Sequence, residues 1–107
     1  MALQKLGINR KDLKEDSPTG AEAGGKMVSV RLVYGPKIRS VQILGDFFLH
    51  PEETLPRIEK ALVGTSPRAK KDEISGKIAK VLSMNNAELI GVTPDAIAET
   101  IRMAVKK

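Results

Sequence analysis

The sequence predicts an α+β fold, in which a small antiparallel sheet is covered by about three helices. Two observations support this prediction. Residues 28–44 alternate apolar and polar side chains around a Gly-Pro turn, as a β-hairpin does. From residue 54 onward, apolar side chains recur at helical spacing. A run of strands followed by a run of helices is typical of the α+β class.

The two arms of the hairpin differ in regularity. In residues 28–34 the apolar positions are Val28, Val30, Leu32 and Tyr34. The second arm places Arg39, Val41 and Ile43 on one face and Ser40 and Gln42 on the other. Ile38 and Leu44 break a strict alternation, which leaves the register open and allows a bulge near either end.

The segment 45–51 that leaves the hairpin contains both phenylalanines of the chain, Phe47 and Phe48. Adjacent side chains of an extended segment face opposite ways, so one ring can enter the core while the other covers a second surface. The favoured interpretation is that Phe47 and Phe48 anchor the sheet to the helices behind it. The alternative is that the ring left outside docks onto a partner protein. Asp46 beside Gly45 is expected to cap the turn, and His50 before Pro51 to pack at the start of a helix rather than bind metal.

Three helices are expected after the hairpin. The first starts near Thr54, because Pro56 cannot lie deep inside a helix, and stops at Gly64. The second has Asp72 as a cap and contains Gly76, which would allow close packing, and Met84-Asn85-Asn86 ends it. The third starts at Thr93-Pro94-Asp95, with threonine as N-cap, and buries the stripe Ile97, Ile101, Ala104 and Val105.

Three shorter segments lie around these elements. Residues 87–92 are apolar enough for a short third strand or an extended connector. Arg68, Lys70 and Lys71 form either a solvated loop or, as a minority interpretation, a phosphate site. Residues 1–23 have few apolar side chains and are expected to be a flexible or weakly ordered arm, so that residues 24–107 form a single domain.

Composition excludes several classes of function. The chain has 107 residues, no cysteine and one histidine, which excludes a disulfide framework, a thiolate nucleophile and cysteine-ligated metal. It carries no secretory or long apolar segment, so a cytoplasmic protein is expected and a membrane partner is not. No Gly-rich phosphate loop or nucleophile motif occurs. These residues predict a binding or accessory domain rather than a self-sufficient enzyme.

The net charge of +5 permits nucleic-acid binding. Lys26, Arg31, Lys37 and Arg39 outnumber Asp46 along the hairpin. They form either a face for an anionic partner or, as favoured here, the charged edges that keep sheets from aggregating. Because only 3% of residues are aromatic, base stacking has little support.

Three segments together resemble the accessory C-terminal domain of lipoate–protein ligase, especially the archaeal form in which that domain is a separate polypeptide. They are Gly24-Gly25-Lys26-Met27-Val28 with Ile38-Arg39-Ser40-Val41, then Gly45-Asp46-Phe47-Phe48-Leu49-His50-Pro51, and Glu88-Leu89-Ile90-Gly91-Val92-Thr93-Pro94-Asp95-Ala96-Ile97-Ala98. The likeness covers roughly residues 24–105. Gly-Asp-Phe-Phe is its most specific part.

This resemblance implies an accessory subunit in a heterodimer with a separate catalytic subunit. That subunit would bind ATP, Mg and lipoate and carry the catalytic residues, whereas this chain would bind no cofactor alone. Together they would activate lipoate to lipoyl-adenylate for transfer to lipoyl-acceptor proteins. Because the sequence starts with methionine, a two-subunit enzyme is the simplest inference, although a fragment of a fused ligase stays open.

The residues expected at the docking surface or near the shared active site are Gly25, Lys26, Gly45, Asp46, Phe47, Phe48 and His50. Two alternatives rank below this interpretation. The first is a basic nucleic-acid-binding module, whose signature would be salt-dependent retention on DNA or RNA. The second is a partner of iron–sulfur assembly, which without cysteine could never hold the cluster itself.

Overall fold

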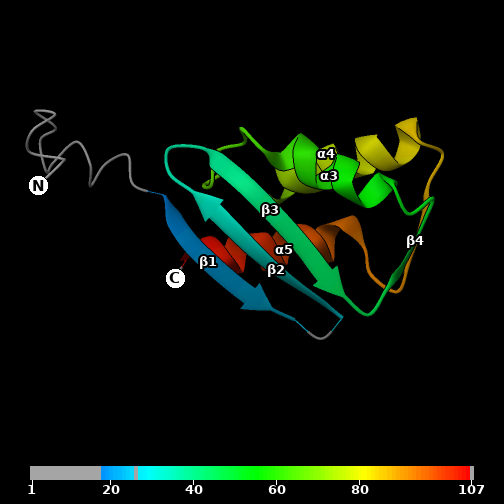
Figure 1. Cartoon of the computed structure of the whole chain (residues 1–107), viewed down its shortest axis with the longest axis horizontal. Coiled ribbons are helices and arrows are strands. Elements are labelled where there is room, and N and C mark those ends of the chain that lie inside the picture. The colour runs from blue at the N-terminus through cyan, green and yellow to red at the C-terminus, as the bar shows by residue number, and fades with distance from the viewer. Residues whose placement is uncertain (1–17, 26, 107) are drawn as a thin grey trace, which may run out of the picture.

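The computed structural model describes residues 18–25 and 27–106, which form two small antiparallel sheets and three helices (Figure 1). In chain order the elements are β1 (Thr19–Gly24), β2 (Val28–Tyr34), β3 (Ile38–Gly45), β4 (Phe48–His50), α3 (Thr54–Leu62), α4 (Lys71–Met84), β5 (Glu88–Ile90) and α5 (Pro94–Lys106). The α+β prediction is confirmed.

The larger sheet has the order β1-β2-β3, and β1 is a strand that the sequence did not predict. Residues 19–23 were assigned to a weakly ordered arm, yet they pair with β2 from Thr19 opposite Tyr34 to Gly24 opposite Ser29. The strand Thr19–Gly24 contains two glycines, two alanines and a glutamate, so its local strand propensity is low. Pairing with β2 and burial of Ala23 stabilise it instead. Residues 1–17 lie outside the described part.

The hairpin pairs β2 with β3 and contains a bulge close to its turn. Val33 lies opposite Ser40, whereas Tyr34 lies opposite Ile38, so Arg39 is the extra residue. The bulge turns Ile38 into the core and leaves Arg39 exposed. The expected bulge is therefore present, and the expectation that Arg39 shares a face with Val41 and Ile43 was wrong.

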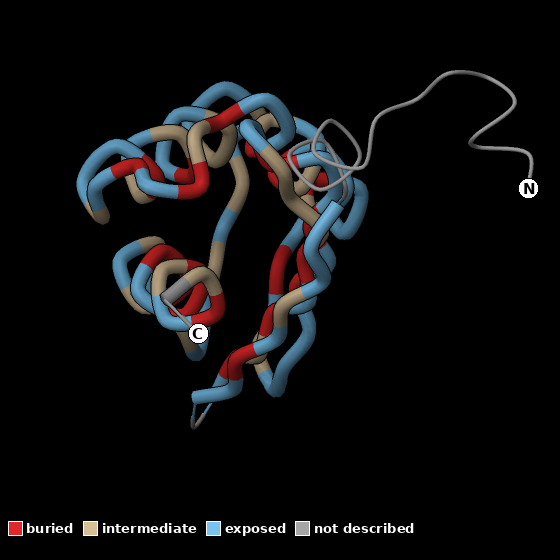
Figure 2. Tube along the Cα trace, turned by 90° about the vertical axis from the view of Figure 1, so that its left-hand side faces the viewer, coloured by how far each residue is buried: buried red, intermediate tan, exposed pale blue. Residues whose placement is uncertain are grey.

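The helices cover one face of the larger sheet. α3 packs against β3, α5 packs across β1 and β2, and α4 packs on both of these helices. Figure 2 shows the buried residues gathered where the sheet and the helices face each other. The fully buried side chains include Leu32, Ile43, Ile58, Leu62, Ile74, Ile78, Ile97 and Ile101.

The β3 edge of the larger sheet forms hydrogen bonds with α3 and with the loop that follows it. At the β3 edge, the backbone N–H of Ile43 donates to Oε2 of Glu59 on α3 at 2.8 Å. Near the start of β3, Ile38 exchanges backbone hydrogen bonds with Gly64 and Thr65, both at 2.8 Å. α3 and the loop after it thus close the β3 edge, so the edge does not depend on charged side chains alone for protection.

The N-cap predicted for α5 is present, whereas the one predicted for α4 is not. The backbone N–H of Ala96 donates to Oγ1 of Thr93 at 3.1 Å, which confirms the predicted cap of α5. Asp72 lies inside the first turn of α4, and Lys70 occupies the N-cap position. Gly76 is exposed, and a Cβ there would meet no atom within 4 Å, so the expected close approach is absent.

The second sheet pairs β4 with β5, with Phe48 opposite Ile90, Leu49 opposite Leu89 and His50 opposite Glu88. Residues 87–92 thus contain the predicted short strand, but it is not the third strand of the hairpin sheet. This pairing fixes the segment that follows the hairpin to the segment that precedes α5.

Candidate partner-docking site

The two phenylalanine rings lie on opposite sides of the backbone, as their adjacency predicted. Phe47 is half-buried and packs against the core. Phe48 is 78% exposed, the highest exposure among the large apolar side chains of the described residues, so the expectation that it anchors the sheet to the helices was wrong. Exposing such a ring on a small domain is unfavourable unless something covers it, because a phenylalanine loses about 2 kcal/mol of transfer free energy by remaining in water. Phe48 is therefore the centre of the candidate docking site.

Other apolar side chains accompany Phe48. Ile90, its cross-strand partner in β5, is 53% exposed. Leu44 at the end of β3 is also exposed, and together with Phe48 it lines a hollow of about 510 Å³ that reaches down to Leu55 of α3. We call Leu44, Phe48 and Ile90 the apolar patch. Apolar patches on an otherwise polar surface are typical of protein-binding sites.

Gly45 sets the direction in which the chain leaves β3. Its φ is +157°, and a Cβ there would lie 2.3 Å from the carbonyl oxygen of Met27 and 2.9 Å from Cα of Val28. No side chain fits at that distance. The backbone N–H of Asp46 donates to the same Met27 carbonyl at 3.0 Å. This close contact with the start of β2 aims the following residues toward β5.

A second glycine completes the packing behind Phe47. Gly91 has a φ of +100°, and a Cβ there would lie 3.4 Å from both Cα and Cβ of Phe47. On its other side Gly91 lines a mainly apolar hollow of about 430 Å³, together with Gly25, Met27 and Met103. The segments around residues 25–28, 45–48 and 90–92 therefore meet at one end of the molecule, the end where β3 passes into β4 in Figure 1.

The structure brings most of the predicted site residues to this end. Gly25, Gly45, Phe47 and Phe48 lie there as described, whereas Lys26 lies outside the described residues. Asp46 is exposed, and its side chain forms no hydrogen bond within the described residues, so the expected turn cap is absent. His50 is exposed on β4 and faces solvent rather than packing at the start of α3.

The sequence did not single out Leu44, Ile90 or Gly91. The sequence did contain a signal for Leu44. In a strictly alternating strand this apolar residue falls among the polar positions, which face outward. The signal for Ile90 was weaker, since three strand residues do not reveal which side faces the core. The role of Gly91 depends on a contact between distant segments, which no local pattern records.

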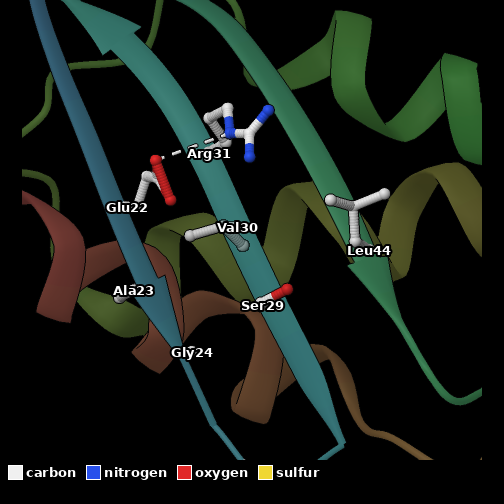
Figure 3. Close-up of a pocket in the computed structure, with 7 residues that line it drawn as sticks. All are labelled: Glu22, Ala23, Gly24, Ser29, Val30, Arg31 and Leu44. Carbon is white, nitrogen blue, oxygen red and sulfur yellow. Dashed lines mark ion pairs between the residues drawn. The ribbon is translucent and has the colours of Figure 1, made fainter.

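Leu44 of the apolar patch also lies on the outer face of the larger sheet (Figure 3). Gly24, Ser29 and Leu44 lie in register across the three strands, and they line a shallow hollow of about 290 Å³. Glu22 and Arg31 also line this hollow, and Nε of Arg31 lies 3.7 Å from Oε2 of Glu22. Both side chains are well exposed, so this ion pair contributes at most about 1 kcal/mol. Arg31 is therefore on a central strand and paired with an acid, rather than on the edge of a basic hairpin.

Residues 18–25 and 27–106 contain no cluster of three or more histidine, aspartate or glutamate side chains that could hold a metal ion. Over the same residues, no helix combines the length and the apolar character needed to cross a bilayer. The apolar patch at the β4 end, backed by the closely packed Gly45 and Gly91, suits binding of a protein surface.

The chain matches no protein-family model and no curated protein. It is similar to a solved chain from the structural analysis of an archaeal lipoylation system, a bi-partite lipoate protein ligase and its E2 lipoyl domain from Thermoplasma acidophilum. The TM-score is 0.56 at 25% identity, over 79% of this chain and 94% of that chain. The likeness covers nearly the whole of the other chain, so the two share their architecture rather than one motif. This similarity connects the chain with protein lipoylation.

Proposed function

We propose that this chain is the accessory subunit of a lipoate–protein ligase. It binds a separate catalytic subunit and is required with it for ATP-dependent activation of lipoate to lipoyl-adenylate. The catalytic subunit holds ATP, Mg and lipoate and carries the reacting groups. Support comes from the similarity to a component of a bi-partite lipoate protein ligase system and from the resemblance of the Gly-Asp-Phe-Phe segment.

The exposure of Phe48 is the observation that carries this proposal. Interface hot spots are enriched in aromatic side chains that stand at the centre of a surface and fill a pocket on the partner. Phe48 has that position, with Leu44 and Ile90 around it. Its backbone is held by pairing with β5 and by the Gly45 and Gly91 contacts, so little conformational entropy is lost when a partner covers the ring.

A subunit without reacting groups can still be essential for activation. Adenylation requires the carboxylate of lipoate and the α-phosphate of ATP to be held in line, and small errors in position reduce the rate strongly. By docking through a preformed surface, the accessory subunit holds loops of the catalytic subunit in the productive arrangement. The expected effect is on activation more than on the affinity of the catalytic subunit for its acceptor protein.

The test is release of pyrophosphate from ATP and lipoate by a matching catalytic subunit, measured with and without this chain. The proposal expects release only when both are present. The chain carrying Phe48→Ser should restore little release at concentrations at which the unchanged chain saturates. If this chain neither binds the catalytic subunit nor changes its rate, the proposal is wrong.

A matched control separates a docking effect from a general loss of surface hydrophobicity. Val63 follows α3, near the turn between β2 and β3, and is 46% exposed. It is thus an exposed apolar residue away from the apolar patch. Val63→Ser should leave pyrophosphate release unchanged while Ile90→Ser reduces it.

A further inference from the structure

A hollow of about 480 Å³ lies at the other end of the molecule, where the turn between β2 and β3 meets the last turns of α5. Its lining residues are Tyr34, Gly35, Pro67, Arg68, Arg102 and Val105. In Figure 1 this turn and the C-terminus lie at the end of the long axis away from β4. The hollow is therefore separate from the apolar patch, and its size is within the range of small-molecule sites.

Two arginines from distant parts of the chain line this hollow. Arg68 belongs to the loop before α4, and Arg102 lies on α5. Within the described residues neither side chain forms a hydrogen bond or an ion pair, and no carboxylate lines the hollow. Two cationic side chains, Arg68 and Arg102, that line one hollow without an acid favour an anion between them.

The remaining walls of the hollow indicate what the anion is attached to. Pro67 is buried, Val105 and Tyr34 are half-buried, and none of the three is charged. An inorganic ion would leave the exposed parts of Tyr34 and Val105 in water. A ligand with an anionic head and a small, flat organic body would use both parts of the hollow, with the head on the arginines and the body on the ring of Tyr34.

We propose that this hollow is a binding site for a small organic phosphate. Arg68 and Arg102 donate to the phosphate oxygens, and the organic part lies against Tyr34, Pro67 and Val105. The planar guanidinium matches two phosphate oxygens at once, and a dianionic phosphate gains more from two such groups than a monoanionic carboxylate does. The proposal does not depend on the function proposed above, because it uses no residue of the apolar patch.

The test is a titration of the full chain with phenyl phosphate, followed by amide chemical shifts in nuclear magnetic resonance spectra. Shifts should saturate and concentrate at the hollow, with weaker binding of benzoate and of inorganic phosphate and none of benzyl alcohol. Arg68→Gln and Arg102→Gln should each weaken binding at least about tenfold. Arg102→Lys should fall between them and the unchanged chain, because lysine keeps the charge but not the fork. Lys80→Gln, an exposed change on α4 that does not line the hollow, should have no effect.

Circular dichroism of each variant excludes loss of fold as the cause of weaker binding. The proposal is overturned if phenyl phosphate fails to saturate, or if its binding is unaffected by both arginine changes. It is also overturned if a single-stranded oligonucleotide displaces phenyl phosphate from the hollow at far lower concentration and with steep salt dependence, because the phosphate would then come from nucleic acid.

Discussion

Phe48 and Ile90 face each other across the pairing of β4 with β5, and both side chains remain exposed. Cross-strand neighbours on one face are close enough to form a single continuous surface. Their shared exposure makes this pair, rather than either residue alone, the expected contact with a partner.

The first prediction concerns this pair. Phe48→Ser should weaken binding to the catalytic subunit by at least about 2 kcal/mol, roughly 30-fold, because hot-spot side chains contribute that much. Isothermal titration calorimetry measures this change, and the unfolding midpoint should move little, because the ring is exposed. Retention of full affinity by the doubly changed chain, Phe48→Ser with Ile90→Ser, would show that the partner binds elsewhere.

Gly45→Ala should destabilise the fold by about 2 kcal/mol or more. The new Cβ would lie 2.3 Å from the Met27 carbonyl oxygen, so the backbone of two segments must move apart. Urea denaturation followed by circular dichroism gives the free energy of unfolding. An unchanged free energy of unfolding would mean that the close contact is not present in solution.

Gly76→Ala, in contrast to Gly45→Ala, should raise the free energy of unfolding. Gly76 lies inside α4 with open space around its Cα, so alanine adds helix propensity without a clash. The expected gain is about 0.5–1 kcal/mol in the free energy of unfolding. The same urea experiment measures it, and a loss of stability would contradict the exposed position.

Glu59→Ala should cost about 1–3 kcal/mol of stability, because the backbone N–H of Ile43 then loses its acceptor in a partly buried position. Glu59→Gln keeps an oxygen acceptor and should cost less. Glu53→Ala, an exposed change just before α3, serves as the control. Equal effects of the alanine changes at positions 59 and 53 would argue against closure of the β3 edge by Glu59.

Thr93→Ala should destabilise the chain by about 1 kcal/mol, since the N–H of Ala96 loses the hydroxyl that caps α5. Thr93→Ser retains that oxygen and should recover most of the loss. Thermal unfolding of the three proteins measures the difference. A serine variant as unstable as the alanine variant would assign the effect to the lost methyl group instead.

The parts of this fold that were predictable are those with local signals. Alternation defined β2, Thr93-Pro94 defined the start of α5, and the adjacency of Phe47 and Phe48 predicted that their rings would face opposite ways. β1 was missed because Thr19–Gly24 has low strand propensity and gains its order from pairing with β2. Met27 and Gly45 are far apart in the sequence, and their backbone contact leaves no periodic signal.

The candidate site was predictable to a similar extent. Composition and the rare aromatics located the segment 45–50, but not the strand that pairs with it. Asp46 and His50 were predicted to cap and to pack, which depends on what lies beside them in space, and both are exposed. The hollow between Arg68 and Arg102 joins a loop and the final helix, so only the tertiary structure could bring it together.

The pairing of β4 with β5 also determines what kind of epitope the apolar patch is. The three residues of the apolar patch come from three strands. Leu44 and Phe48 are close in the sequence, whereas Ile90 is far from both. A synthetic peptide spanning residues 43–52 contains the Gly-Asp-Phe-Phe segment but lacks Ile90 and the contacts that hold its backbone. Recognition is therefore conformational rather than linear, and such a peptide should compete poorly with the folded chain for its partner.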